Sequence, residues 1–143
     1  MFMLAALFVR PVAILAPQAH VEILAQLSIF AIVVFALGVM LRWASILYLG
    51  KFFTIDVSVA VDHKIIDTGP YRLIRHPSYS GLLLMWLGIG MSTGNALALL
   101  VIMLPGIGLL YRIKIEESVL AESLGSSYRE YMHKTKRLIP FVY

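Results

Sequence analysis

Long apolar stretches alternate with short polar blocks along the chain, and this alternation predicts its architecture. Residues 23–41 contain 19 positions without a charge. As a helix they span about 28 Å, close to the hydrocarbon thickness of a bilayer. The apolar pattern continues past Arg42, and Trp43 and Lys51 are the aromatic and basic residues typical of a membrane boundary. This stretch is the clearest predicted membrane helix.

Other apolar segments predict further helices. Residues 1–15 form a first, imperfect membrane helix, because Arg10 and Pro11 interrupt it. Residues 82–91 and 96–111 are each short for a span, and the uncharged turn between them favours a helical hairpin over a single irregular helix. The predicted fold class is all-α: a polytopic integral membrane helical bundle of about four membrane helices, including this C-terminal hairpin, with a cytosolic loop and a C-terminal helix.

The distribution of charges indicates which segments lie outside the membrane and on which side. Of the 143 residues, 60% are hydrophobic and 14% are charged, against roughly 45–50% and 25% in soluble domains, which excludes an ordinary soluble domain. Seventeen of the 20 charges lie in residues 51–78 and 111–143. An even number of predicted crossings separates these blocks, and their ten Lys and Arg residues predict that both face the cytoplasm. We expect one domain over residues 1–143, with membrane helices in residues 1–50 and the chemistry in residues 51–143.

The sequence lacks the residues that are characteristic of several kinds of enzyme and metal site. The chain has no cysteine, which excludes a disulfide framework, a thiolate nucleophile and metal–thiolate sites. Its four histidines have no metal-ligand spacing, so we expect no metal. The P-loop, the nucleophile elbow and the glycine-rich dinucleotide motif are also missing from the sequence. The net charge of +4 comes without a zinc-finger or recognition-helix pattern, so we expect no nucleic-acid partner.

The densest group of unusual residues is the sequence TGPYRLIRHPSYSG, which begins at Thr68. Thr68 is expected to cap a short helix that has Pro70 in its first turn. Pro77 disfavours helical backbone at His76, so the chain is expected to bend there and to begin a new helix. Free backbone N–H groups at such a helix start favour polar or anionic parts of a ligand.

Charged residues near this segment also have a purely structural interpretation. At an interfacial elbow, Arg72 and Arg75 would contact lipid phosphates. Arg112 and Glu116 are four positions apart, share one helix face and would form a surface ion pair. Their position at the apolar boundary favours a functional role, because a charge there is costly unless it is paired or faces a cavity.

Three motifs follow one another in the second half of the chain. They are HKIIDTGPYRLIRHPSYSG at residues 63–81, Arg-x-x-x-Glu-Glu at residues 112–117, and Gly-x-x-Tyr-x-x-Tyr at residues 125–131. Together they resemble the isoprenylcysteine carboxyl methyltransferase family over about residues 60–141, and phospholipid N-methyltransferases share much of the pattern. The resemblance implies an integral membrane enzyme that uses S-adenosyl-L-methionine, contacts membrane lipids and acts on a lipophilic small-molecule or lipidated substrate.

The resemblance also implies the site residues. Arg112 is the implied catalytic and substrate-binding residue, since its guanidinium can orient a carboxylate that needs no general base at pH 7. Glu116 can accept hydrogen bonds from the methyl donor, and tyrosine rings can flank the adenine or the sulfonium. The implied cofactor-binding residues are His63, Lys64, Ile65, Ile66, Tyr71, His76, Pro77, Ser78, Tyr79 and Glu116.

We therefore expect carboxyl O-methylation, with N-methylation of a phospholipid or a small amine as the second possibility. An NADPH-dependent membrane reductase of the sterol type is a rival from another enzyme class. A membrane subunit that has kept the fold and lost turnover is a rival without catalysis.

Overall fold

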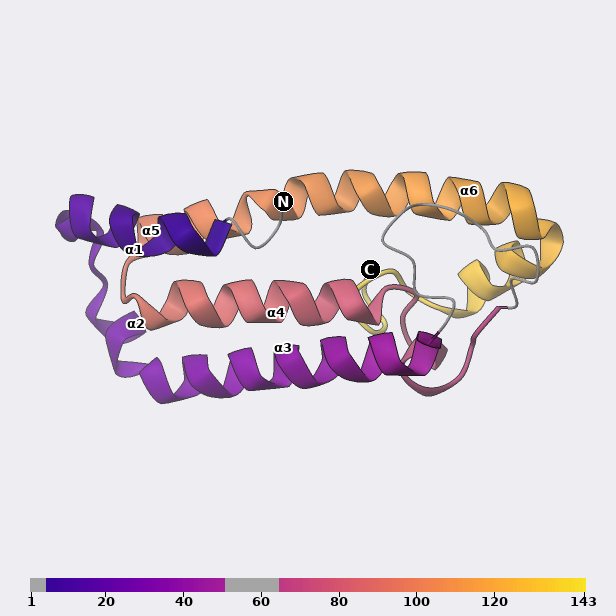
Figure 1. Ribbon diagram of the computed structural model, residues 1–143, viewed down its shortest axis with the longest axis horizontal. Coiled ribbons are helices and arrows are strands. Elements are labelled where there is room, and N and C mark those ends of the chain that lie inside the picture. The colour runs from indigo at the N-terminus through magenta and orange to yellow at the C-terminus, as the bar shows by residue number, and fades with distance from the viewer. Residues whose placement is uncertain (1–4, 51–64) are drawn as a thin grey trace. The chain divides into compact units, whose positions relative to one another are not determined.

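The computed structural model describes residues 5–50 and 65–143, and within these ranges the chain is helices, turns and loops without a strand (Figure 1). The all-α prediction is confirmed for this part of the chain. Its helices are α1 (Ala5–Leu15), η1 (Pro17–Ala19), α2 (Glu22–Gln26), α3 (Ser28–Leu49), η3 (Gly69–Arg72), α4 (Pro77–Ser92), α5 (Ala96–Met103) and α6 (Pro105–Lys134).

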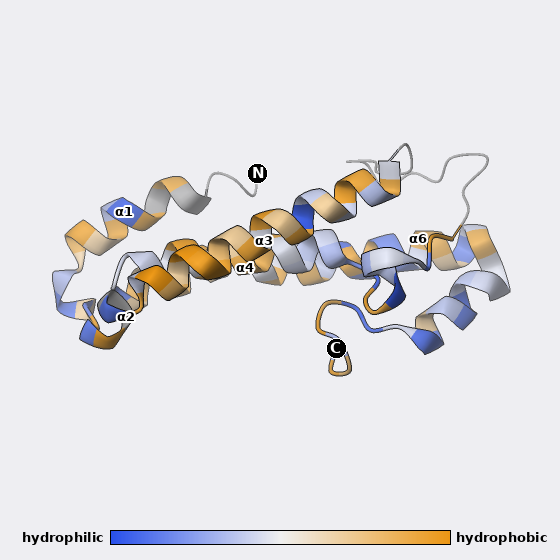
Figure 2. Cartoon of the chain, turned by 90° about the horizontal axis from the view of Figure 1, so that it is seen from below, coloured by the Kyte–Doolittle hydropathy of each residue, from blue (hydrophilic) through white to orange (hydrophobic). Residues whose placement is uncertain are grey.

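Two helical segments of the described ranges are long and apolar enough to cross a membrane. They are α3, Ser28–Leu49, and the segment Ala96–Lys134, which comprises α5 and α6. In α3 the hydrophobic residues are largely not covered by protein: Ile29 is 78% exposed and Ile32 is 64% exposed. Figure 2 shows the apolar colouring along α3 and α4. An apolar helix surface that the protein leaves uncovered is typical of a helix solvated by lipid.

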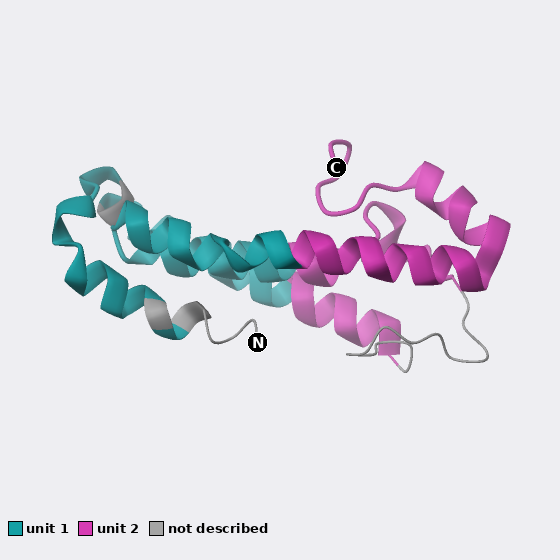
Figure 3. Ribbon diagram, turned by 90° about the horizontal axis from the view of Figure 1, so that it is seen from above, with its two compact units in different colours: residues 1–40, 81–108 teal, residues 41–80, 109–143 magenta. Residues whose placement is uncertain are grey.

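The chain divides into two compact units, each of which draws on both halves of the sequence (Figure 3). Unit 1 comprises Met1–Met40 and Gly81–Gly108, and unit 2 comprises Leu41–Ser80 and Leu109–Tyr143. The core of unit 1 joins α1, α4 and α5 through the buried side chains of Val9, Leu82, Trp86, Ala98 and Ile102. Helix α1 runs through Pro11 without ending, although proline removes one backbone donor there.

Glycines let α3 and α4 approach closely within unit 1. A Cβ atom on Gly38 would lie 2.7 Å from the carbonyl oxygen of Gly81, and one on Gly88 would lie 2.7 Å from that of Ala31. Both contacts are with backbone atoms, which cannot move aside as a flexible side chain can. Small residues at these positions therefore set the spacing of the two helices.

A tight turn joins α4 to α5 at the predicted place. The Asn95 side chain accepts a hydrogen bond from the N–H of Ala98 at 3.0 Å and donates to the carbonyl of Ala16 at 2.8 Å, so it caps α5 and ties the turn to the end of α1. The predicted arm over residues 96–111 is not one helix, because α5 ends at Met103 and α6 begins at Pro105. Proline lacks the N–H that would continue α5 but suits the first turn of the next helix.

Unit 2 contains the predicted bend at His76-Pro77, and α4 begins at Pro77 as expected. Upstream, Thr68 occupies the N-cap position of η3 with extended backbone, although its side chain makes no capping hydrogen bond. Helix α6 extends far beyond residue 111 and changes direction at Gly125, whose φ of 60° and ψ of −131° suit glycine. The C-terminal tail, residues 135–143, follows α6.

Candidate functional site

The candidate site is built from the first turn of α4, the middle of α6 and the C-terminal tail, all in unit 2. The tail runs beside the segment that precedes α4 and bonds to it through the backbone. The backbone N–H of Arg75 donates to the carbonyl of Lys136 at 2.7 Å, and the backbone N–H of His76 donates to the carbonyl of Arg137 at 3.0 Å. The Ser80 hydroxyl adds a bond to the Leu138 carbonyl at 2.6 Å. This pairing holds the start of α4 in a fixed place within the unit.

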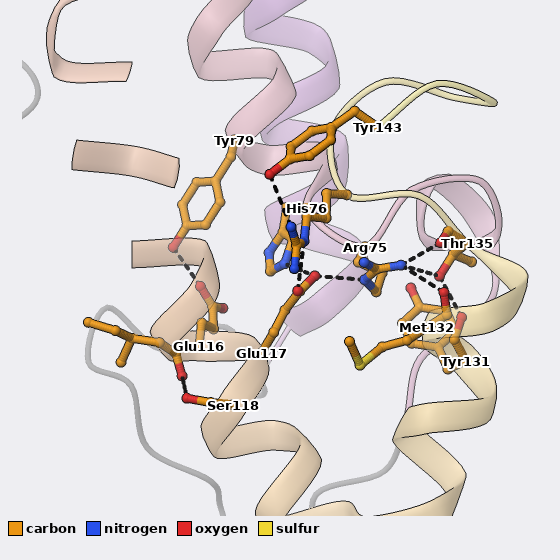
Figure 4. Close-up of polar contacts among 12 residues, drawn as sticks. Arg75, His76, Tyr79, Glu116, Glu117, Ser118, Tyr131, Met132, Thr135 and Tyr143 are labelled. Carbon is orange, nitrogen blue, oxygen red and sulfur yellow. Dashed lines mark hydrogen bonds and ion pairs between the residues drawn. The ribbon is translucent and has the colours of Figure 1, made fainter. Parts of the chain in front are cut away.

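The Tyr79 hydroxyl joins the two residues that the sequence predicted for chemistry on α6. It donates to Oε2 of Glu116 at 2.9 Å and accepts from Nε of Arg112 at 3.0 Å. All three side chains are half-buried. We call this set the Tyr79 triad. One cationic and one anionic group are thus bonded to the same neutral hydroxyl. Figure 4 shows the contact between Tyr79 and Glu116.

Glu117 points to a different set of partners from its neighbour Glu116 (Figure 4). Its side chain is buried and forms ion pairs with Arg75 and Arg137, each at 2.8 Å. The Nε2 atom of His76 lies 3.3 Å from the same carboxylate. The His76 ring in turn stacks on the Tyr79 ring, with centroids 5.5 Å apart and planes 14° apart. Buried charges are tolerated when they are paired in this way.

The alternative interpretation of Arg75 as a lipid-phosphate ligand is wrong. Its side chain is 7% exposed and its Nη1 donates to the carbonyls of Met132 and Thr135. Together with the Glu117 ion pair, these bonds occupy the guanidinium inside the protein. Arg72, by contrast, is exposed.

Tyr71 anchors the short helix η3 between two other elements of unit 2. Its hydroxyl donates to the Ser45 carbonyl at 3.3 Å, and its own carbonyl accepts from the Tyr131 hydroxyl at 2.7 Å. Burial, followed by the charge of Glu116, raises the pKa of Tyr71 above its ordinary value. The phenol therefore remains a neutral hydrogen-bond donor at physiological pH.

Arg42 interrupts the apolar sequence of α3 and reaches the start of α4. Its Nη1 donates to both the carbonyl and the hydroxyl of Ser78, each at 3.2 Å. The Ser78 side chain is buried. A cation that contacts the serine at this helix start adds a positive charge where backbone N–H groups already favour anionic ligand groups.

The predicted site residues divide into three groups. His63 and Lys64 lie outside the described residues, while Ile65 and Ile66 are described and half-buried. The structure places the other positions in unit 2, where η3 supplies one, the residue before α4 another, and α4 and α6 the rest: Tyr71, His76, Pro77, Ser78, Tyr79, Arg112 and Glu116.

The prediction missed the buried ion cluster of Arg75, Arg137 and Glu117. One signal for it was available, because Leu109, Ile113 and Glu117 are spaced by four and all three are buried on one face of α6. A carboxylate in an apolar stripe needs a cationic partner. That partner could not be chosen from local sequence, since Arg75 lies 42 positions before Glu117.

Comparisons with known proteins bear directly on this arrangement. The sequence profile of the isoprenylcysteine carboxyl methyltransferase (ICMT) family matches residues 29–122, more than half of the chain. This chain belongs to that family. The match begins well before residue 60, where the resemblance of the motifs started, so it includes most of α3.

Individual members of the family support the same assignment. Protein-S-isoprenylcysteine O-methyltransferase B of Arabidopsis thaliana is 33% identical over 121 residues, which are 81% of this chain and 60% of that protein. The corresponding protein of Schizosaccharomyces pombe is 33% identical over 74% of this chain and 46% of its own length. The solved structure of the eukaryotic intramembrane Ras methyltransferase ICMT superposes with a TM-score of 0.75 at 32% identity, covering 82% of this chain and 43% of that one. The chain thus spans less than two thirds of the length of each of these relatives.

Proposed function

We propose that the protein transfers a methyl group from S-adenosyl-L-methionine to the carboxylate of a lipophilic acceptor, with an isoprenylcysteine as the acceptor class. The names of the relatives support this reaction, since they are O-methyltransferases of S-isoprenylcysteine. The observation that carries the proposal is the Tyr79 triad, in which a guanidinium and a carboxylate are held by one hydroxyl. Methyl transfer to a carboxylate brings a cationic sulfonium donor close to an anionic acceptor, and the triad offers one group of opposite charge to each.

The residues around the triad fit the methyl donor. The donor carries an amino group and a sulfonium cation, for which the Glu116 carboxylate and the Tyr79 ring are suitable partners. The carboxylate of the donor suits the first turn of α4, where Ser78 lies against Arg42. When bound, S-adenosyl-L-methionine supplies an activated methyl group. The proposed cofactor-binding residues remain His63, Lys64, Ile65, Ile66, Tyr71, His76, Pro77, Ser78, Tyr79 and Glu116.

Arg112 is the proposed residue for the acceptor. Its guanidinium can form paired hydrogen bonds with a carboxylate and so aim one oxygen at the methyl carbon. A carboxylate is ionised at pH 7, so the reaction needs orientation and exclusion of water rather than a general base. The Tyr79 hydroxyl, bonded to Nε of Arg112, limits the directions in which the guanidinium can turn.

The proposed setting is a membrane. We infer a polytopic protein with about four crossings, including a hairpin of the apolar segments around the turn at Asn95, and with the site on the cytoplasmic side. The uncovered apolar surface of α3 supports membrane insertion, and the concentration of Lys and Arg in the two polar blocks supports the cytoplasmic side. Such a setting lets a water-soluble donor meet a lipid-borne acceptor.

N-methylation of an amine is the second candidate, because related N-methyltransferases share the box around His76. The guanidinium of Arg112 favours the carboxylate acceptor, since a cation attracts a carboxylate and repels a protonated amine. The sterol-type reductase and the inactive subunit have no comparable support among the relatives.

Calorimetry in detergent tests the proposal. Purified protein is titrated with S-adenosylhomocysteine and, separately, with NADPH. We expect heat of binding from the first and none from the second. Absence of S-adenosylhomocysteine binding would contradict the methyltransferase proposal, and binding of NADPH in its place would favour the reductase.

Variants of α6 then assign the two roles. Glu116→Ala is expected to weaken S-adenosylhomocysteine binding by about tenfold, the effect of losing one charge-assisted hydrogen bond. Arg112→Ala is expected to bind it nearly as well and to lose methyl transfer. If both variants behave like the wild type, the two residues have no role in binding or turnover, and their bonds to Tyr79 are only structural.

A further inference from the structure

Glu117 has more cationic partners than its charge requires. Its carboxylate belongs to a residue only 3% exposed, and it receives two guanidinium groups and one imidazole. One guanidinium is enough to neutralise a buried carboxylate. Stability does not explain the excess either, because buried ion pairs replaced by apolar residues often leave a protein equally stable. What the three partners share is that they come from segments that flank the Tyr79 triad.

We propose that Glu117 is a positioning residue for the cofactor site: it holds the His76 ring in one orientation, with the proton on Nε2, and fastens the C-terminal tail to the start of α4. The inference rests on the proposed function, because it concerns the same site. It adds a role for a residue outside the proposed donor-binding and acceptor-binding set.

Hydrogen-bond chemistry determines the state of His76. An ionised carboxylate can only accept hydrogen bonds, so the His76 nitrogen facing Oε1 of Glu117 at 3.3 Å carries a proton. In the neutral ring, Nδ1 is then the unprotonated nitrogen and can accept a hydrogen bond from a ligand. Rotation or loss of the carboxylate would free the ring to take the other tautomer.

The orientation of His76 extends to the residues proposed for chemistry. Its ring stacks on that of Tyr79, and the Tyr79 hydroxyl contacts Arg112 and Glu116. A shift of the imidazole would therefore move the surface against which Tyr79 packs. Glu117 therefore supports Tyr79 indirectly, through one stacked pair of rings.

The tail is tied to His76 by two independent links. The carbonyl of Arg137 accepts from the backbone N–H of His76 at 3.0 Å, while its guanidinium binds Oε2 of Glu117 at 2.8 Å. Arg137 also donates to the Tyr143 hydroxyl at 3.0 Å and lies over the Tyr143 ring at 5.4 Å. The tail therefore lies against the start of α4, and Glu117 is one of the points that hold it there.

The test compares Glu117→Gln with the matched control Glu130→Gln. Both changes remove one negative charge from α6, but Glu130 is exposed and pairs with Lys134, four positions along the helix, at 2.6 Å. For Glu117→Gln we expect the Kd for S-adenosylhomocysteine to rise about tenfold, with the KM for the acceptor changed less than twofold. The control is expected to match the wild type in both constants.

Nuclear magnetic resonance of protein labelled with ¹⁵N-histidine gives a reading independent of activity. The Nε2–H proton of His76, assigned from its loss in His76→Asn, is expected far downfield in the wild type, because it is bonded to a carboxylate. In Glu117→Gln it is expected to move upfield. Glu117→Asp, which keeps the charge, is expected to recover part of both the affinity and the proton shift.

The outcomes separate this inference from the proposed function. A folded Glu117→Gln variant with wild-type affinity and an unmoved His76 proton would overturn the inference. If Glu117→Gln does not fold, Arg137→Gln replaces it, and unchanged S-adenosylhomocysteine affinity in that variant would overturn the role of the tail. If the wild type binds no S-adenosylhomocysteine, the proposed function fails, and the His76 resonance alone decides whether Glu117 positions the ring.

Discussion

Replacing Tyr79 by phenylalanine removes a single oxygen atom from the centre of the Tyr79 triad. The ring and its stacking on His76 remain. What is lost are two hydrogen bonds, one donated to Glu116 at 2.9 Å and one accepted from Arg112 at 3.0 Å. The change therefore separates the positioning of charged groups from the packing of the ring.

The expected size follows from those two bonds. A hydrogen bond to a charged group contributes about 1.5–3 kcal/mol. Because the triad is half-buried, water replaces part of each bond in the variant, and we take about 1.5–3 kcal/mol for the two together. At about 1.4 kcal/mol for each factor of ten, kcat/KM should fall by about 10- to 100-fold. The loss should appear both in donor affinity, through Glu116, and in turnover, through Arg112.

Initial rates of methyl transfer in detergent micelles measure this effect, with donor and prenylcysteine acceptor varied in turn. Tyr111→Phe is the matched control, because Tyr111 precedes Arg112 on α6 and is 69% exposed. We expect the control to retain wild-type rates. Wild-type kcat/KM in Tyr79→Phe would refute the claim that this hydroxyl positions Arg112 and Glu116, and an equal loss in both variants would show that the effect is not specific to the triad.

Two further predictions concern the scaffold in unit 1. Gly88→Ala should destabilise the protein by about 1–3 kcal/mol, because the new methyl group would lie 2.7 Å from the Ala31 carbonyl oxygen. The control is Gly108→Ala, since a Cβ at Gly108 would have nothing within 4 Å. This control should leave the thermal midpoint of unfolding in detergent unchanged or raised. Asn95→Ala should cost about 2 kcal/mol by removing the cap of α5 and leaving the Ala16 carbonyl without its 2.8 Å donor, and an unshifted midpoint would show that the capped turn contributes nothing to stability.

The features that the sequence predicted well are those that local chemistry determines. Proline restricts the residue before it, so the bend at His76-Pro77 and the start of α4 were predictable from two adjacent residues. The turn capped by Asn95 lies where the only polar residues interrupt an apolar region. The long apolar segments likewise predicted helices.

Long-range pairing accounts for most of what was missed. Nothing local to Arg75 distinguishes a lipid-facing arginine from one buried against Glu117, since the decision depends on a helix that begins 30 positions later in the chain. The adjacent carboxylates of Glu116 and Glu117 look equivalent in the sequence, yet the helix turns them toward different partners. The change of direction at Gly125 was also missed, although its positive φ gives a physical reason for glycine there.

Methyl transfer to a carboxylate leaves a methyl ester, and the chemical nature of the product therefore distinguishes it from N-methylation. Detergent-solubilised protein is incubated with S-adenosyl-L-methionine labelled with tritium in its methyl group and with an S-farnesylcysteine derivative, and the product is then treated with base. A methyl ester releases volatile labelled methanol under these conditions, whereas an N-methyl group does not. We expect base-labile label that depends on Arg112. Label that resists base, or label in lipid amines with none in the farnesylcysteine, would contradict it.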